Sequence, residues 1–275
     1  MFGYVLWNFS GVMFEFGGIK IMWYGVLFAT GLALSAWWIF KRFIEEGMTE
    51  KDFEILVIWG FVCMFLGCRL AHCLFYQWDY FSQHLLEIFL PIKEKVGGGW
   101  KFTGYHGLAS HGGAVGMVVA LLIFKLKTKK NLWKAMDIVT IAACLTGGFI
   151  RLGNLMNSEI VGVETSMPWG FIFTKIDYVP RHPAQLYEAI FYFALFVVLQ
   201  YVYNKKRYKR EAEGFYVGLA LTGIFLFRFL IEFVKEVQED FESDMLLDMG
   251  QILSLPFIVA GLIIIFLRKS GQKSK

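Results

Sequence analysis

The stretch DIVTIAACLTGGFIRLGNLMNSEIVG, residues 137–162, decides the fold class. Its first half is apolar enough for a membrane-spanning helix, whereas its second half adds an arginine, two asparagines and a glutamate, namely Arg151, Asn154, Asn157 and Glu159. A charged side chain is costly in a lipid bilayer, so such a residue within or beside a span is a functional hypothesis by default. The stretch therefore predicts a polar site at the edge of a membrane.

The composition of the 275 residues is that of a membrane protein, because 57% are hydrophobic and only 18% are charged, more apolar surface than a soluble core needs. Seven mostly apolar runs approach the length of a spanning helix: 21–40, 53–75, 108–124, 135–152, 185–203, 213–233 and 249–267. The first run lacks the basic flank and cleavage site of a signal peptide, so we expect it to remain as a helix. We predict an all-α polytopic membrane protein with seven transmembrane helices.

The basic residues predict the orientation of these helices. The connections after the first, third, fifth and seventh runs hold 17 of the 27 lysines and arginines. By the positive-inside rule, the N-terminus lies outside and the C-terminus in the cytoplasm. The formal charge of +4 follows from this topology and does not indicate a nucleic-acid partner.

Two outer segments are long, 77–107 and 158–183. The first is amphipathic up to a glycine run at 97–99, and we expect it to lie along the membrane surface. The second has β-branched and aromatic residues around a Pro-Trp-Gly turn, which favours a small extracytoplasmic head. We find no repeat or second soluble domain, so residues 1–275 are interpreted as a single integral membrane domain.

The four cysteines fall inside the apolar runs, where they are expected to pack as small buried residues. Cys68 and His72 have the i, i+4 spacing that a metal could use, but two convincing further ligands are missing. Packing is therefore favoured over a metal site. The sequence also lacks HExxH and phosphate-loop motifs, so we expect no cofactor.

Of the cationic or titratable residues within the runs, the candidates for a functional site are Arg69, His111, Arg151 and Arg228. Chain direction places all four near the outer leaflet, where the abundant anion is a phospholipid phosphate. Arginine binds phosphate oxygens with two parallel hydrogen bonds and stays charged. Two structural alternatives stay open: the arginines anchor the helices at the interface, or Arg228 and Glu232 form an ion pair that joins helices.

His111 lies at the start of the third run beside glycines, where an imidazole could act as a base toward a substrate. The following Gly112 and Gly116 have the small-xxx-small spacing that is typical of close helix packing.

The chain resembles the phosphatidylglycerol:prolipoprotein diacylglyceryl transferases over nearly its whole length. A family signature is matched by Arg151, Gly153, Asn154, Met156, Asn157, Glu159 and Gly162. Further motifs follow in the family order: WYG with Tyr24, GCRLAHCLFY, SHGG, PWG, HPAQLYE, FRFLIEF and MGQILSLP. Departures from the family pattern are Ile150, Leu155, Ile224 and Lys235, the last of which stands where a second arginine would follow Glu232.

The resemblance implies transfer of a diacylglyceryl group from phosphatidylglycerol to the lipobox cysteine of a prolipoprotein, forming a thioether and releasing glycerol 1-phosphate. It implies the bacterial cytoplasmic (inner) membrane, with the active site toward the outer leaflet and membrane lipids as partners. His111 and Arg228 are the expected catalytic residues, although which arginine favours the transition state is left open. The expected substrate-binding residues are Arg151, Tyr24, Asn154, Asn157, Glu159, Gly162, Glu232 and Arg69.

Two other classes of membrane protein fit less well. A seven-helix retinal pigment needs a Schiff-base lysine in its last helix, and the run at 249–267 contains none. A secondary transporter usually places its charges near the midplane between repeated halves, whereas these charges lie toward one surface and no repeat is found. An uptake assay run beside a lipid-transfer assay separates a transporter from a transferase.

Overall fold

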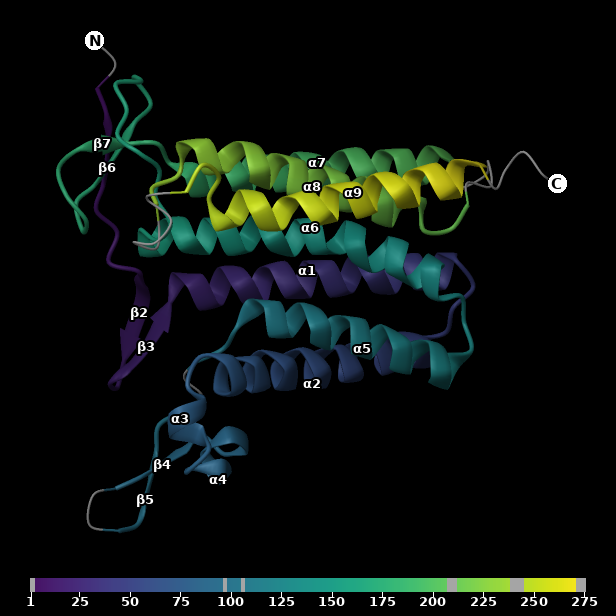
Figure 1. Cartoon of the computed structure of the whole chain (residues 1–275), viewed down its shortest axis with the longest axis horizontal. Helices are drawn as coiled ribbons and strands as arrows, with labels where there is room; N and C mark the ends of the chain where they lie inside the picture. Colours follow the sequence, from purple (N-terminus) through teal and green to yellow (C-terminus); the bar gives the residue numbers. More distant parts are fainter. Residues whose placement is uncertain (1–2, 96–97, 105–106, 207–211, 238–244, 271–275) are drawn as a thin grey trace. The chain divides into compact units, whose positions relative to one another are not determined.

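The computed structural model describes residues 3–95, 98–104, 107–206, 212–237 and 245–270 (Figure 1). The chain divides into two compact units. Unit 1 comprises Met1–Arg42 and Met136–Lys275, and unit 2 comprises Phe43–Ala135. Parts of the predicted glycine breaker, of the basic connection after the fifth run and of the basic tail lie outside the described residues.

The seven predicted spans are confirmed, because seven helices of the described chain are long and apolar enough to cross a membrane. They are α1 (Trp23–Glu45), α2 (Glu50–Phe75), α5 (Ser110–Thr128), α6 (Leu132–Asn157), α7 (Ala184–Lys206), α8 (Phe215–Ile231) and α9 (Met249–Ser270). Large apolar side chains such as Phe61, Val115 and Phe266 remain exposed on these helices. Helices that are apolar over most of their circumference suit a lipid environment, so this is a multi-pass membrane protein.

In unit 2, α2 packs against α5 through glycines. A Cβ atom added to Gly67 would lie 2.2 Å from the carbonyl oxygen of Gly112, and one added to Gly116 would lie 2.1 Å from that of Cys63. The absence of side chains at these positions lets the two backbones touch. The packing role predicted for Gly112 and Gly116 is confirmed.

The outer segment of unit 2 is less continuous than its amphipathic pattern predicts. It forms two short helices, α3 (Trp78–Phe81) and α4 (Leu85–Phe89), and a hairpin of β4 (Ile92–Glu94) and β5 (Trp100–Phe102). The helical stretch ends because Leu90 adopts an extended conformation immediately before Pro91, and a proline disfavours helical geometry in the residue before it.

In unit 1, polar contacts and glycines hold the helices together. Ser35 on α1 donates to the carbonyl of Ala142 on α6 over 2.9 Å. The carboxylate of Asp137 accepts hydrogen bonds from the backbone N–H groups of Gly214 and Val217, at 2.7 and 2.9 Å. It thereby satisfies donors that the start of α8 would otherwise leave unpaired. In turn, α8 packs closely on α9, and Figure 1 shows these two helices side by side with α7.

The predicted head at 158–183 is a small sheet-containing region of unit 1. Its strands β6 (Phe171–Phe173) and β7 (Pro180–Arg181) pair antiparallel. A third strand, β1 (Val5–Trp7), pairs parallel with β6 and was not predicted, because it precedes the first apolar run. Between β1 and α1, the strands β2 (Val12–Phe16) and β3 (Ile19–Met22) form a hairpin. The core of the head comprises Leu155, Val161, Phe171 and Phe173.

Candidate active site

The polar residues of the opening stretch form a continuous chain of contacts at the end of α6. Arg151 donates from Nη1 to Oδ1 of Asn154 over 3.4 Å. The Nδ2 atoms of Asn154 and Asn157 donate to the two carboxylate oxygens of Glu159, at 3.1 and 3.0 Å. Ser158 adopts a left-handed conformation with φ of 57°, which ends the helix and turns the chain so that Glu159 can reach back. The structure thus brings these four predicted residues together.

Tyr24 lies next to this group, in the first turn of α1. A Cβ atom added to Gly153 would lie 2.7 Å from Cδ2 of Tyr24, so the two helices approach closely where the signature has a glycine. The position of Tyr24 therefore depends on the missing side chain at Gly153.

The predicted ion pair on α8 is confirmed. The guanidinium Nη2 of Arg228 lies 3.5 Å from Oε1 of Glu232, one helical turn later. Glu232 begins the short 3₁₀ helix η1 (Glu232–Val234), which continues from α8.

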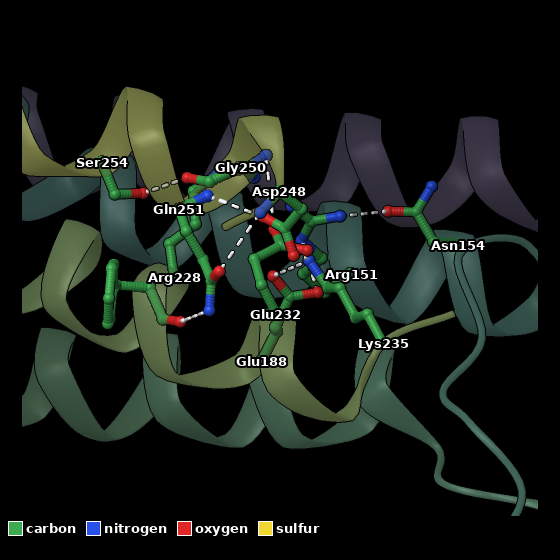
Figure 2. Close-up of polar contacts among 11 residues, drawn as sticks. Arg151, Asn154, Glu188, Arg228, Glu232, Lys235, Asp248, Gly250, Gln251 and Ser254 are labelled. Carbon is green, nitrogen blue, oxygen red and sulfur yellow. Dashed lines mark hydrogen bonds and ion pairs between the residues drawn. The ribbon is translucent and has the colours of Figure 1, made fainter. Parts of the chain in front are cut away.

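Two charged residues for which the sequence predicted no role in the site connect Arg228 to Arg151. Glu188 on α7 is fully buried, and its Oε2 lies 3.2 Å from Nε of Arg151. The Nζ of Lys235 lies 3.2 Å from Oε1 of Glu188 and 3.1 Å from Oε1 of Glu232. We call Arg151, Glu188, Lys235, Glu232 and Arg228 the charge cluster. Its members come from α6, α7, α8 and the η1 segment with the residue that follows it, and Figure 2 shows them gathered together.

A signal for both missed residues was present in the sequence. Glu188 is a carboxylate within an apolar run, in the motif HPAQLYE, and Lys235 is a departure from the family pattern that was assigned no role. The contact between Lys235 and Glu188 joins residues that are 47 positions apart in the chain, and no local pattern reveals such a contact.

Exposure differs within the charge cluster. The side chains of Glu188 and Lys235 are 0% and 3% exposed, whereas those of Arg151 and Arg228 are 14% and 34% exposed. The inner members therefore neutralise one another in a buried position, as buried charges require. The two guanidinium groups are the accessible ends of the cluster.

The start of α9 closes one side of the cluster. A Cβ atom added to Gly250 would lie 2.5 Å from Oε1 of Glu232, so only glycine leaves room for this carboxylate in its observed position. Asp248 and Gln251 exchange hydrogen bonds at the first turn, and Gln251 also donates to the carbonyl of Phe229 over 3.4 Å (Figure 2). Through these contacts α9 is fixed against the end of α8.

The head is connected to the charge cluster through Gly162, which forms an isolated β-bridge with Lys235. A Cβ atom added to Gly162 would lie 2.6 Å from the carbonyl oxygens of both His182 and Val234. Gly162 is thus enclosed by backbone, and its described contacts position the chain near Lys235.

A second ion-pair group lies in the head. Arg181 is 2.6 Å from Asp177 and 3.1 Å from Glu236. The hydrogen bonds from Arg181 hold the pKa of Asp177 below its usual value.

Unit 2 contains the other two predicted site residues. Arg69 is buried and donates to backbone carbonyls, over 3.0 Å to Ile88 and 3.5 Å to Gly107, and also to Glu87. Its guanidinium lies 4.8 Å from the centroid of the Phe81 ring. These contacts hold the outer segment of unit 2 against α2. They do not test the substrate contact predicted for Arg69, which stays a prediction.

His111 lies exposed in the first turn of α5, and its ring centroid is 5.7 Å from that of Tyr76. An exposed imidazole at a helix start is available to a substrate. Its approach to the arginines of unit 1 stays a prediction.

Within the described ranges, no group of three or more His, Cys, Asp or Glu side chains could hold a metal ion. His72 instead stacks on Tyr76 at 5.9 Å between ring centroids. A Cβ atom added to Gly107 would lie 2.1 Å from Nε2 of His72, so the ring fills the space beside this glycine.

These features define a multi-pass membrane protein whose helices enclose a buried charge cluster next to a small sheet-containing head. Residues 11–267 match the family model described as prolipoprotein diacylglyceryl transferase. The chain belongs to this family.

Its relatives include proteins named phosphatidylglycerol--prolipoprotein diacylglyceryl transferase. The protein of Bacteroides fragilis is 47% identical over 260 residues, which cover 94% of each chain. That of Tolumonas auensis is 40% identical over 265 residues, covering 96% of this chain and 97% of the relative. That of Porphyromonas gingivalis is 39% identical over 274 residues, covering 94% and 93%.

Proposed function

We propose that this chain transfers the diacylglyceryl group of phosphatidylglycerol to the lipobox cysteine of a prolipoprotein. The products are a thioether-linked lipoprotein precursor and glycerol 1-phosphate, and this transfer is the first step of lipoprotein maturation. Family membership and the names of the relatives support the reaction and its substrates. The observation in the structure that carries the proposal is the charge cluster with its two accessible arginines.

The guanidinium groups of Arg151 and Arg228 hold the phosphate of the lipid. Each pairs with a carboxylate that also contacts Lys235, so the arginines are oriented before the lipid arrives. Fixed cations of this kind stabilise the charge that develops on a leaving phosphate, and they need no reorganisation during the reaction. Arg228, with the more exposed side chain, has the larger surface available to the substrate.

The thiol supplies the nucleophile. A cysteine thiol has a reference pKa near 8.5, so at neutral pH it is mostly protonated and a base increases the reactive fraction. His111 accepts the thiol proton, and the thiolate sulfur attacks the glyceryl carbon of the lipid. The carbon–oxygen bond to the phosphate breaks, and its electron pair leaves on the phosphate oxygen of glycerol 1-phosphate.

The neighbouring polar groups bind the glycerol headgroup or orient Arg151. Asn154 contacts both Arg151 and Glu159, so it fixes the guanidinium relative to the carboxylate. Asn157 donates a hydrogen bond to the other carboxylate oxygen of Glu159. The hydroxyl of Tyr24 adds a donor beside this group. Gly162 acts indirectly, by allowing the backbone approach that positions Lys235.

The enzyme lies in the bacterial cytoplasmic (inner) membrane with its N-terminus and active site toward the outer leaflet. The distribution of basic residues supports this orientation. Reporter fusions test it: a reporter after Lys130 or Lys206 should be cytoplasmic, and one at 97–100 should be outside. The reverse pattern contradicts the placement of the site.

The reaction is tested with the purified full-length protein in detergent, phosphatidylglycerol and a lipobox peptide. The expected products are the thioether-linked peptide and glycerol 1-phosphate in equal amounts. A peptide with serine in place of the lipobox cysteine is the matched control and should give neither product. Absence of both products with the cysteine peptide contradicts the proposed function.

A further inference from the structure

Lys235 occupies an unusual position in the charge cluster, because its ammonium group contacts carboxylates from two different helical segments. Its side chain is 3% exposed, and its Nζ lies 3.2 Å from Glu188 and 3.1 Å from Glu232. Each carboxylate also contacts one arginine, Glu188 with Arg151 and Glu232 with Arg228. Three cations therefore share two carboxylates (Figure 2).

This sharing determines how much positive charge the arginines present to a ligand. Without Lys235, each carboxylate would belong to a single arginine, and each arginine would be matched by one full negative charge. A phosphate would then have to compete with that carboxylate for the same guanidinium. With Lys235 present, part of the charge of each carboxylate is balanced from the buried side, where electrostatic interactions are screened least.

We propose that Lys235 is a positioning residue, which draws Glu188 and Glu232 toward the interior and leaves the charge of Arg151 and Arg228 available to a phosphodiester. The inference rests on the proposed function and adds a residue to it. Lys235 does not touch the lipid, because its buried ammonium acts through the two carboxylates.

The backbone of Lys235 is held in a way that suits this role. It follows the 3₁₀ helix η1 and bridges to Gly162. The next residue, Glu236, donates from its backbone N–H to the carbonyl of Val161 over 3.1 Å, and its carboxylate contacts Arg181. Both neighbours of the lysine are thus fixed, so its side chain has little freedom to leave the carboxylates.

A purely structural ion pair gives different expectations from a positioning residue. If Lys235 only stabilises the fold, its removal lowers the thermal midpoint and reduces the amount of active enzyme without changing the affinity for substrate. If it controls the arginines, its removal weakens the use of phosphatidylglycerol specifically. The Michaelis constants for lipid and peptide, measured separately, distinguish these cases.

The experiment compares Lys235→Met and Lys235→Arg with wild type in the transfer assay, with Lys175→Met as the control at an exposed lysine of the head. Lys235→Met should raise the KM for phosphatidylglycerol about tenfold or more, the scale of one charged hydrogen bond, and leave the KM for the peptide unchanged. Lys235→Arg keeps the charge, so both Michaelis constants should stay near their wild-type values. Lys175→Met should behave as wild type.

A double variant sharpens the test. Lys235→Met combined with Glu188→Gln removes one charge of each sign, so Arg151 is no longer matched by its own carboxylate. The KM for phosphatidylglycerol should fall back part of the way from the value of Lys235→Met. If Lys235→Met does not fold, Lys235→Gln is measured in its place. The amide keeps N–H donors but has no charge, so this variant should also raise the KM for phosphatidylglycerol.

The outcomes separate the two proposals. An unchanged KM for phosphatidylglycerol in folded Lys235→Met or Lys235→Gln contradicts the role of Lys235, as does a double variant that shows no recovery. Wild-type protein that gives no transfer product contradicts the proposed function itself. Specific loss of lipid affinity, with recovery in the double variant, supports the positioning role.

Discussion

Unit 1 and unit 2 use arginine in opposite ways. In unit 1, Arg151 and Arg228 pair with carboxylates, and their side chains remain 14% and 34% exposed. In unit 2, Arg69 is buried and donates to the carbonyls of Ile88, Gly107 and Glu87. The same residue type, in the same kind of apolar run, therefore supports a candidate binding site in one unit and local architecture in the other.

The difference shows which feature of an intramembrane arginine points to function. Neutral carbonyls that surround a guanidinium satisfy its donors and tie chain segments together. Carboxylates that are themselves shared with Lys235 orient a guanidinium and leave part of its charge for a ligand. The partners of an arginine are more informative than its depth in the membrane.

The largest expected effect concerns the one residue of unit 2 that we assign to chemistry. His111→Gln should lower the rate of transfer by about 10²–10⁴-fold, the range for loss of a general base. Binding of phosphatidylglycerol should be largely retained, because the base acts on the thiol. The measurements are single-turnover transfer and lipid binding on the same preparation. Near-normal turnover would show that His111 is not the base and would confine the chemistry to unit 1.

A smaller effect is expected when the carboxylate of the Arg228 pair is displaced. In Gly250→Ala the new methyl group meets Oε1 of Glu232 at 2.5 Å, and the end of a flexible side chain can move away. Transfer should fall about tenfold, the scale of one charged hydrogen bond, with little change in thermal midpoint. Gly147→Ala is the matched control, because its methyl group meets Tyr192 at an ordinary 3.5 Å. Equal activity in the two variants would show that the geometry of the ion pair does not matter.

Arg69→Lys should affect stability more than activity. Lysine cannot reproduce the fork that serves several carbonyls, so the thermal midpoint should fall by about 3–6 °C, as one or two lost hydrogen bonds would give. Transfer per folded molecule should fall less than in lysine variants of Arg151 or Arg228. A severe loss of transfer without a change in midpoint would make Arg69 a substrate contact and remove the distinction between the units.

The smallest effect lies in the head, where Arg181 lowers the pKa of Asp177. A carboxylate with a lowered pKa contributes stability above its unfolded pKa of about 3.9 and loses that contribution as the pH falls through the folded value. Asp177→Asn should therefore lower the thermal midpoint slightly at pH 7, and the difference from wild type should shrink toward pH 3. A difference that is constant with pH would show that the charge of Asp177 is not responsible.

The spans and the signature residues were predictable because each depends on local patterns. Apolar runs of sufficient length indicate spanning helices, and the group from Arg151 to Glu159 lies within nine consecutive positions. The ion pair of Arg228 and Glu232 follows from i, i+4 spacing on one helix.

The remaining features depend on contacts between distant segments. β1 pairs with a strand more than 160 positions later, and the role of Lys235 exists only where α7 and η1 bring Glu188 and Glu232 to it. The carbonyl partners of Arg69 carry no side-chain signal at all, because any residue supplies a backbone carbonyl. Sequence patterns therefore predicted the charged residues more readily than their partners.

The most direct test of the phosphate-binding claim is the transfer rate of Arg151→Lys and Arg228→Lys, measured on folded, membrane-inserted protein. Lysine keeps the charge and reaches the interface equally well, but it loses the two-pronged contact with phosphate. Each variant should lose on the order of 1.5–3 kcal/mol of transition-state stabilisation, the value of a charged hydrogen bond, while its thermal midpoint stays near that of wild type. Wild-type transfer rates in both variants would contradict the claim that these arginines hold the phosphate.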